Sequence, residues 1–337
     1  MSSTPPNRIL SPEEIALRAG GTDPELRLMP EAGVFAERAL RLRQLAANHS
    51  LRDYLMLMAV ICEAQHRRLP DFPPVALPTP QQVQAASEAR QPLLSIHTWP
   101  RDPVWRDEWR TLMADVLTHL PEGSPARAGV QAASALGDDA LEQQAARLLT
   151  GITLGLDVGS APLIAAGLQL YWTVLTLRAA AADPRQLLGD TNDATRCPCC
   201  GSLPTTSITR SGGKRQGQRY LHCALCNVEW QMARVQCTHC LGTEGVHYEA
   251  LQPVTETAPP SRLSPIEAET CATCQHYLKI LHMDRDAQVE PVADDLASMT
   301  LDLLVSQAGF SRHGVNLMLL FGDSEGGDQA PPERGLG

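Results

Sequence analysis

Hydrophobic residues recur with helical spacing through much of the first 190 residues. In residues 34–48 (VFAERALRLRQLAAN), apolar side chains follow one another three or four positions apart, and residues 50–69, 105–120 and 138–152 repeat this pattern. Such spacing places the apolar residues on one face of each helix. We therefore expect amphipathic helices that pack through these faces. The expected core positions are Phe35, Ala39, Leu42, Leu45, Leu51, Leu55, Met58, Cys62, Trp105, Trp109, Leu112, Val116, Leu120, Leu141, Ala145, Leu148 and Ile152.

Residues 161–177 (APLIAAGLQLYWTVLTL) form the longest apolar run, and it is apolar on all sides. The run has 17 residues and is interrupted by Gln169, Thr173 and Thr176, which makes it short for a membrane span. A helix without a polar face is typical of the centre of a bundle. The pattern predicts a buried core helix and no membrane span.

The helical period fades after about residue 196, and short segments with β-type alternation replace it. Strands are predicted in residues 205–209, 218–223, 228–235 and 277–283, with a turn at 210–218. A helical pattern returns over residues 293–310, where Leu296, Thr300, Leu303 and Gln307 form one stripe with Leu304 beside it. We expect this stripe to pack on the N-terminal helices.

These patterns predict a mostly α-helical N-terminal bundle, a small β-rich region and a returning C-terminal helix. The expected divisions are residues 1–190 for the helical domain, 191–290 for two tandem β-rich metal ribbons, each built on two C-x-x-C pairs, and 291–322 for the returning helix that packs on the helical domain. Residues 323–337 are rich in Gly, Pro and charge, which predicts a disordered tail.

The chain is acidic overall, with a formal net charge of −10 over 337 residues. It lacks the broad basic surface of most nucleic-acid-binding proteins, which argues against nucleic acid as a partner. One local basic group keeps that class open as an alternative, and it consists of Arg210, Lys214, Arg215 and Arg219. The N-terminal sequence has no apolar stretch behind a basic start, which predicts a cytoplasmic protein.

Nine of the ten cysteines lie between residues 197 and 274, and eight of them form four C-x-x-C pairs. The pairs are Cys197/Cys200, Cys223/Cys226, Cys237/Cys240 and Cys271/Cys274. A C-x-x-C turn directs two thiolates at one ion, and two such turns complete a tetrahedral four-sulfur site. Disulfides would conflict with a reducing compartment, and a thioredoxin-like pair needs a βαβ context that is missing here. The sequence therefore predicts two metal ions, each in a four-cysteine site.

The pairing of the C-x-x-C turns and the identity of the metal stay open at this point. Sequential pairing, first with second and third with fourth, competes with an interleaved cross-brace. Zinc and iron both suit four thiolates, and in either case the cysteines fill every coordination position. We expect Cys199 to be a spare thiol exposed to oxidation, and His222 and His239 to lie beside the sites or at the surface.

Several stretches of the chain together resemble the FdhE family of formate dehydrogenase accessory proteins. They include CPCCGSLPTTS, GQRYLHCALCNVEWQMARVQCTHC, ETCATCQHYLKIL and VEPVADDLASMTLDLLVSQAGF. The likeness extends to SLRDYLMLMAVICEAQ and NLMLLFG, so it covers nearly the whole chain. Cys199 is a departure from the family pattern.

The resemblance implies a cytoplasmic maturation factor with rubredoxin-like metal sites. It further implies iron as the metal, with zinc as the alternative, and the catalytic subunit of formate dehydrogenase as the partner. No paired carboxylates and no nucleophile with a neighbouring base can be recognised in the sequence, so we expect an accessory protein without catalytic residues or an organic cofactor. A redox role for iron stays open, as does the alternative of a zinc-ribbon adaptor for nucleic acid or transcription machinery.

Overall fold

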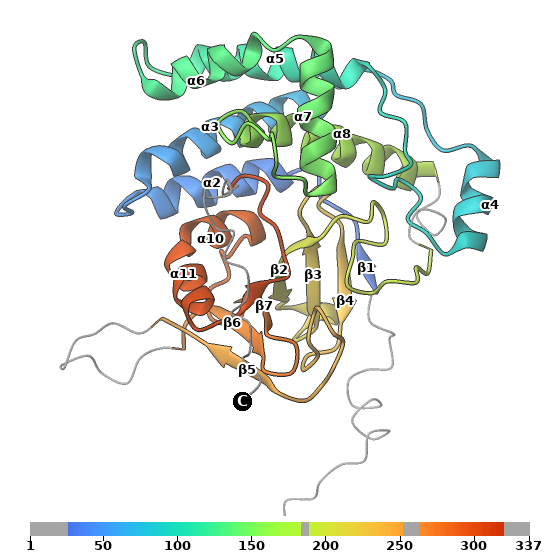
Figure 1. Cartoon of the computed structure of the whole chain (residues 1–337), viewed down its shortest axis with the longest axis vertical. Helices are drawn as coiled ribbons and strands as arrows, with labels where there is room; N and C mark the ends of the chain where they lie inside the picture. Colours follow the sequence, from blue (N-terminus) through green and yellow to red (C-terminus); the bar gives the residue numbers. More distant parts are fainter. Residues whose placement is uncertain (1–25, 183–188, 252–262, 320–337) are drawn as a thin grey trace, which may run out of the picture.

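The computed structural model describes residues 26–182, 189–251 and 263–319, in which a layer of helices covers one end of a β-sheet (Figure 1). The tail predicted for residues 323–337 lies outside the described residues. The predicted fold class is confirmed: a helical N-terminal region precedes a β-rich region with two four-cysteine clusters and C-terminal helices. The helices of the N-terminal region are α2 (Val34–Ala46), α3 (Arg52–Arg68), α4 (Pro80–Ala89), α5 (Val104–His119), α6 (Pro125–Ser134), α7 (Asp138–Thr150) and α8 (Ala161–Ala182).

The amphipathic stripes pack around α8, as the sequence predicts. Trp105 and Trp109 of α5 are buried, and the Trp109 indole N–H donates to the carbonyl of Leu163 at 2.9 Å. Ile152 is an exception at 50% exposure, because α7 ends before it and Gly151 turns the chain away with a φ of +71°. Helix α3 begins at Arg52, and no side chain caps its first turn.

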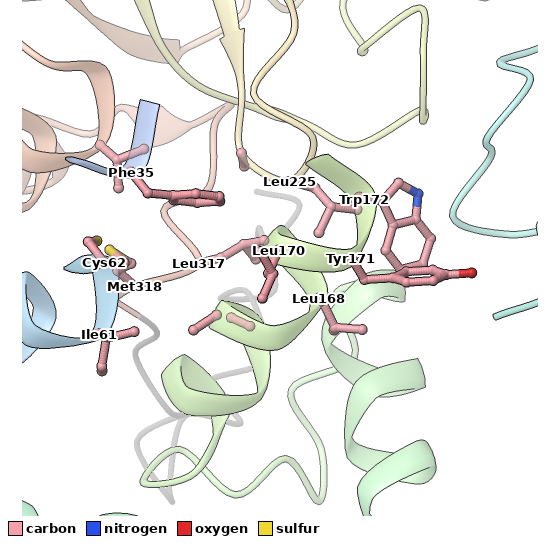
Figure 2. Packing of buried hydrophobic residues seen from close by; sticks show 14 of the residues in the cluster. Phe35, Ile61, Cys62, Leu168, Leu170, Tyr171, Trp172, Leu225, Leu317 and Met318 are labelled. Atoms are coloured by element: carbon pink, nitrogen blue, oxygen red, sulfur yellow. The ribbon is translucent and has the colours of Figure 1, made fainter. Parts of the chain in front are cut away.

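Within the described residues, α8 is the one helix long and apolar enough to cross a membrane by length and composition. Of its most apolar window, 83% is buried inside the protein. Residues from other segments surround it in Figure 2: Ile61 and Cys62 from α3, Phe35 from α2 and Leu225 from the β-rich region. The expectation of a central core helix is therefore confirmed, and Cys62 is a small buried hydrophobe within the same core.

The strands form one mixed sheet with the order β1-β4-β3-β2-β7-β6-β5, and β8 pairs with β7. Parallel pairing of β2 with β7, which aligns Ser207 with Ile280, joins the two halves. The sequence predicts four of these strands but misses this joint, which turns two tandem ribbons into one sheet. The strands are β1 (Arg27–Leu28), β2 (Pro204–Thr209), β3 (Arg219–Cys223), β4 (Glu229–Met232), β5 (Val246–Glu249), β6 (Ile266–Cys271), β7 (His276–His282) and β8 (Ser311–Arg312).

The returning C-terminal helix is broken into α10 (Pro291–Ala297) and α11 (Met299–Gln307). The break lies at Ser298, whose hydroxyl donates to the carbonyl of Asp294 at 2.7 Å. Helix α10 packs on α2, whereas α11 packs on β6 and β8. The predicted stripe is therefore wrong beyond Leu296, because the break changes the helical register. Leu301 and Val305 are buried, whereas Leu303 and Leu304 are about half exposed.

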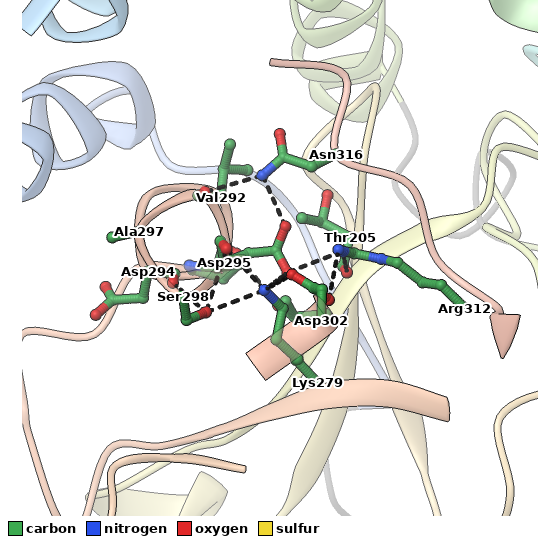
Figure 3. A network of polar contacts seen from close by, with 12 residues as sticks. Thr205, Lys279, Val292, Asp294, Asp295, Ala297, Ser298, Asp302, Arg312 and Asn316 are labelled. Carbon is green, nitrogen blue, oxygen red and sulfur yellow. Dashed lines mark hydrogen bonds and ion pairs between the residues drawn. The ribbon is translucent and has the colours of Figure 1, made fainter. Parts of the chain in front are cut away.

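A buried ionic network fixes this C-terminal segment to the sheet (Figure 3). Lys279 of β7 has no exposed side-chain surface, and its ammonium group lies 2.9 Å from Asp295 and 2.6 Å from Asp302. Arg312 reaches the same two carboxylates at 2.8 Å and 3.2 Å. Asn316 adds a hydrogen bond to Asp295 at 2.8 Å. Buried charges are tolerated only when they are paired in this way.

Candidate metal centres

The first cluster contains Cys197, Cys200, Cys223 and Cys226. The sulfur of Cys197 lies 3.5 Å from that of Cys226, and the sulfur of Cys200 lies 3.5 Å from that of Cys223. All four side chains are buried, and every cysteine of the chain is in the free form. This arrangement is the sequential one, in which the first and second C-x-x-C turns meet.

The second cluster contains Cys237, Cys240, Cys271 and Cys274. Its sulfurs are 3.6 Å apart between Cys237 and Cys274, and 3.8 Å apart between Cys240 and Cys271. Unlike the first cluster it reaches the surface, because Cys240 is exposed and Cys274 is half-buried. Solvent can therefore reach one of the two clusters.

All four C-x-x-C turns share one backbone geometry. The residue after the second cysteine has a left-handed conformation in each turn: Gly201 (φ +77°), Asn227 (φ +60°), Leu241 (φ +60°) and Gln275 (φ +58°). In three turns its N–H donates to the carbonyl of the first cysteine at 2.8–3.0 Å, which closes the turn. A left-handed non-glycine residue costs about 1–2 kcal/mol. The turns adopt it in order to hold both sulfurs on one side.

The sulfur positions fit a tetrahedral metal ion. Four ligands at a metal–sulfur distance of about 2.3 Å lie about 3.8 Å from one another in a regular tetrahedron. The four cross-turn distances of 3.5–3.8 Å agree with this spacing. Backbone N–H groups also point at the sulfurs, since Leu225 donates to Cys223 at 3.3 Å and His239 to Cys237 at 3.4 Å. Such donors stabilise thiolates rather than thiols.

Burial governs the acidity of the thiols. It raises the pKa of Cys197 to about 11 and raises the pKa of Cys200 and Cys226 well above the ordinary value. Burial opposes ionisation of Cys223 too, but hydrogen bonds from neighbouring thiols outweigh it and lower the pKa of Cys223. Four thiolates would be stable in this buried site only with a cation among them. A bound divalent or trivalent metal ion would supply that charge.

The first cluster is attached to the helical core through polar contacts. Gln169 of α8 donates to the carbonyl of Ala224 at 2.8 Å, within the second turn of the cluster. Asn227 donates to Thr173 of α8 at 2.9 Å and accepts from Arg38 of α2 at 2.7 Å. The polar residues that interrupt the apolar run of α8 therefore orient the metal turns. Their position within that run is the signal by which the sequence could have identified them.

Cys199 differs from the prediction, because it is fully buried instead of exposed to oxidation. Its sulfur lies 3.4 Å from the hydroxyl of Thr176 in α8, and its backbone carbonyl accepts from Leu94 at 3.0 Å. It does not belong to the group of four sulfurs that make up the first cluster. The adjacent Cys200 belongs to that cluster, whereas the Cys199 side chain contacts α8.

The local basic group is not a continuous patch. Arg219 has no exposed side-chain surface and pairs with Glu269 of β6 at 2.8 Å. Arg210 forms an ion pair with the buried Glu229. Two of the four basic residues thus stabilise the sheet itself. The sequence pattern did not indicate that Arg210 and Arg219 pair with acidic residues of the same sheet.

Two histidines that are adjacent in sequence to cysteines of the clusters have different environments. His222 is buried, its Nδ1 has no hydrogen-bond partner among the described residues, and burial lowers its pKa to about 3. His239 is exposed, and its ring stacks on that of His276. His239 therefore lies at the surface beside the second cluster, as expected.

Together, the helical bundle and the two four-cysteine clusters on one sheet define a protein with two candidate metal sites, in which cysteine alone would supply the ligands. Three family models match the chain: "FdhE, N-terminal" over residues 23–188, "FdhE, central domain" over 196–234 and "FdhE, C-terminal domain" over 235–319. The chain belongs to the FdhE family.

Individual relatives agree with this assignment. The chain is 37% identical over 293 residues to the protein FdhE homolog of Cronobacter sakazakii, covering 87% of this chain and 90% of the relative. It is also 37% identical over 295 residues to the protein FdhE of Salmonella dublin, with the same coverage. The crystal structure of the FdhE protein from Pseudomonas aeruginosa is similar, with a TM-score of 0.73 and 30% identity over 87% of this chain and 98% of that one.

Proposed function

We propose that this protein is an accessory factor for the maturation of formate dehydrogenase, and that it binds the catalytic subunit in the cytoplasm as a folded, metal-stabilised scaffold. The observation that carries the proposal is family membership along nearly the whole described chain, combined with eight cysteines gathered into two four-sulfur clusters. The residues proposed as metal ligands are those of the two clusters. The protein acts in this proposal without catalysing a reaction of its own.

We further propose that residues 1–190, 191–290 and 291–322 work as one scaffold. The ion pair of Arg38 with Glu290 supports this, because it joins α2 to the start of α10 at 2.9 Å. One apolar cluster also contains residues of the helices, of the first metal turns and of the C-terminal segment, as Phe35, Leu225 and Leu317 illustrate in Figure 2. A preformed body of this kind binds a partner without first being ordered, which lowers the cost of association.

The second ribbon, which comprises residues 235–251 and 263–282 around the second cluster, is the proposed contact for the catalytic subunit. The first cluster is buried against α8, whereas the second is partly exposed. Apolar side chains on the second ribbon also face solvent, including Val235 at 54% exposure and Tyr248 at 41%. The segments that carry Val235 and Tyr248 are in contact, because the Tyr248 hydroxyl donates to the carbonyl of Arg234 at 3.1 Å. Exposed apolar surface of this kind is typical of an interaction site.

A pull-down under reducing conditions tests the proposal. Tagged protein is expected to recover the catalytic subunit of formate dehydrogenase, and Val235→Asp is expected to reduce that recovery. The matched control is Leu154→Asp, because Leu154 is an exposed leucine at 81% that lies between α7 and α8, away from the second ribbon. Recovery of nucleic acid or RNA polymerase instead of the catalytic subunit would favour the adaptor alternative and overturn this one.

Iron is the proposed metal, with zinc as the alternative, and this choice rests on the family resemblance. Protein purified without air is expected to contain two ions per chain, and oxidation is expected to produce the visible absorption of a ferric tetrathiolate. A colourless protein that contains two zinc ions would change the assigned metal from iron to zinc and would leave the proposed scaffold role unchanged. If removal of the metal ions abolishes recovery of the catalytic subunit, then binding of the subunit depends on the metal sites.

A further inference from the structure

Three histidines converge beside the second cluster, from three separate segments. His239 belongs to the third C-x-x-C turn, His276 is the first residue of β7, and His313 follows β8. The rings of His239 and His276 stack with centroids 3.6 Å apart and an angle of 3° between the planes. Because the nitrogen lone pairs lie in the ring planes, the exposed ring of His239 has to turn out of this stack before both rings can bind one ion. The ring of His313 lies edge-on to His239 at 5.2 Å. None of these imidazoles belongs to the group of four sulfurs.

The orientation of His276 fits a metal ligand. Its Nδ1 lies 2.7 Å from the backbone carbonyl of Cys274. A carbonyl only accepts hydrogen bonds, so Nδ1 carries a proton and Nε2 of the neutral ring retains its lone pair. Metal-binding histidines usually donate their second N–H to a carbonyl or a carboxylate in this way, which fixes the ring and the tautomer.

The second observation is the position of a thiolate. The ligand atoms of His239, His276 and Cys274 all lie within 4.8 Å of one another. Cys274 also belongs to the second four-sulfur cluster, so its sulfur would bridge two ions. Four thiolates around one divalent ion carry a net charge of −2, which attracts another cation to this side. Imidazole and thiolate together suit zinc and other late first-row divalent ions.

There is also room for a further ligand. A cavity of about 360 Å³ borders this group and is lined in part by His239, His276 and His313. His239 is exposed and His276 half-buried, so an ion can arrive from solvent without unfolding of the ribbon. A site with three protein ligands that opens to a cavity keeps one coordination position free. The four-cysteine sites have no such position.

We propose a third metal site on this protein, in which His239, His276 and the bridging thiolate of Cys274 bind a divalent transition-metal ion such as Zn²⁺, with one position open to the cavity. The inference rests on the proposed four-cysteine site that contains Cys274. It differs from that site in its accessibility and in its nitrogen ligands. A free coordination position allows the ion to bind a small anionic or thiol ligand.

The test counts zinc ions per chain. Full-length protein with zinc in both four-cysteine sites is dialysed against free Zn²⁺ held at a set concentration by a weak chelator, and the bound zinc is measured. Wild type is expected to bind three ions, and the double variant His239→Asn, His276→Asn is expected to bind two. His247→Asn is the matched control, because His247 is an exposed histidine of β5 in the same ribbon and should leave three ions bound.

The outcomes separate this inference from the proposed function. Fewer than two ions in wild type would contradict the four-cysteine sites themselves. Two ions and no third, or a third ion that the double variant retains, would overturn only the further site. If the double variant also loses an ion from a four-cysteine site, imidazole ¹⁵N spectra of wild-type protein decide the matter. The Nε2 signal of His276 is expected to shift on addition of the third equivalent, and an unchanged signal overturns the site.

Discussion

Replacement of Arg38 by methionine should destabilise the whole protein, because this one side chain connects three regions. Arg38 has no exposed surface, and its Nε donates to Glu290 at 2.9 Å. Its Nη2 donates to Asn227 at 2.7 Å, in the second metal turn. Glu290 in turn caps α10 by accepting from the N–H groups of Val292 and Ala293. The change therefore affects α2, the first cluster and the C-terminal segment at once.

The magnitude follows from what the substitution leaves behind. Methionine retains much of the apolar volume, so little of the cost comes from packing. The carboxylate of Glu290, with 10% of its side chain exposed, loses its cation, and the amide oxygen of Asn227 loses its donor. Removal of one partner of a buried ion pair costs about 3–5 kcal/mol, and an unpaired buried acceptor about 1–3 kcal/mol. The two losses overlap, so we expect about 3–5 kcal/mol in total.

Urea denaturation of the metal-loaded protein, followed by circular dichroism, measures this loss. Arg43→Met is the control on the same helix, since Arg43 and its partner Glu63 are 37% and 32% exposed. Exposed pairs contribute about 0–1 kcal/mol, so the control should change stability little. A loss for Arg38→Met that falls within about 1 kcal/mol of the control would refute the reasoning. A double-mutant cycle with Glu290→Gln would then assign the remaining coupling.

Three further predictions concern the metals, the packing and the pH dependence. In protein purified without added zinc, Cys200→Ser and Cys240→Ser should each reduce the metal content from two ions to one. A chromogenic chelator should extract the ion of the exposed second cluster from this wild-type protein first, and equal extraction rates would contradict the difference in burial. Gly167→Ala should destabilise α8 by about 1–3 kcal/mol in thermal unfolding, because a Cβ would lie 2.5 Å from Trp109, whereas Gly129→Ala in α6 has open space and should be neutral or stabilising. Burial and the charge of Arg285 lower the pKa of His282, and they outweigh the opposing effect of Glu267, whose carboxylate lies 2.9 Å from its Nε2. As the pH falls through about 6.5, the unfolded chain therefore takes up this proton before the folded protein does. The free energy of unfolding should therefore fall as the pH drops through that value, and His282→Asn should reduce the slope in denaturant titrations.

The sequence predicts the helical region well because the signal is local. Period and apolar content place α2, α3, α5 and α8 and assign Trp105 and Trp109 to the core, and each of these follows from neighbours within one helix. The sequence also identifies the residues of the two cysteine clusters, since the C-x-x-C spacing is itself a structural unit. These are the features for which short-range pattern and chemistry coincide.

Contacts between distant segments could not be read in the same way. The pairing of β2 with β7 depends on two strands that are separated along the chain by β3, β4, β5 and β6. The break at Ser298 depends on Lys279, which donates to its hydroxyl at 3.0 Å from another element. Arg219 looks like part of a basic surface until Glu269 is placed beside it. In each case the deciding partner lies outside the window in which a pattern is visible.

The contact between α2 and α10 also determines when the chain can finish folding. Arg38 and Glu290 are 252 positions apart in sequence, so α2 emerges from the ribosome long before its partner exists. Until then the arginine has no carboxylate to neutralise it, and the face that α10 will cover stays open. Contacts of such long sequence separation form late. The α2–α10 contact can thus form only when synthesis is nearly complete. A chain that ends before residue 290 would contain all four C-x-x-C turns but would lack α10, which packs on α2.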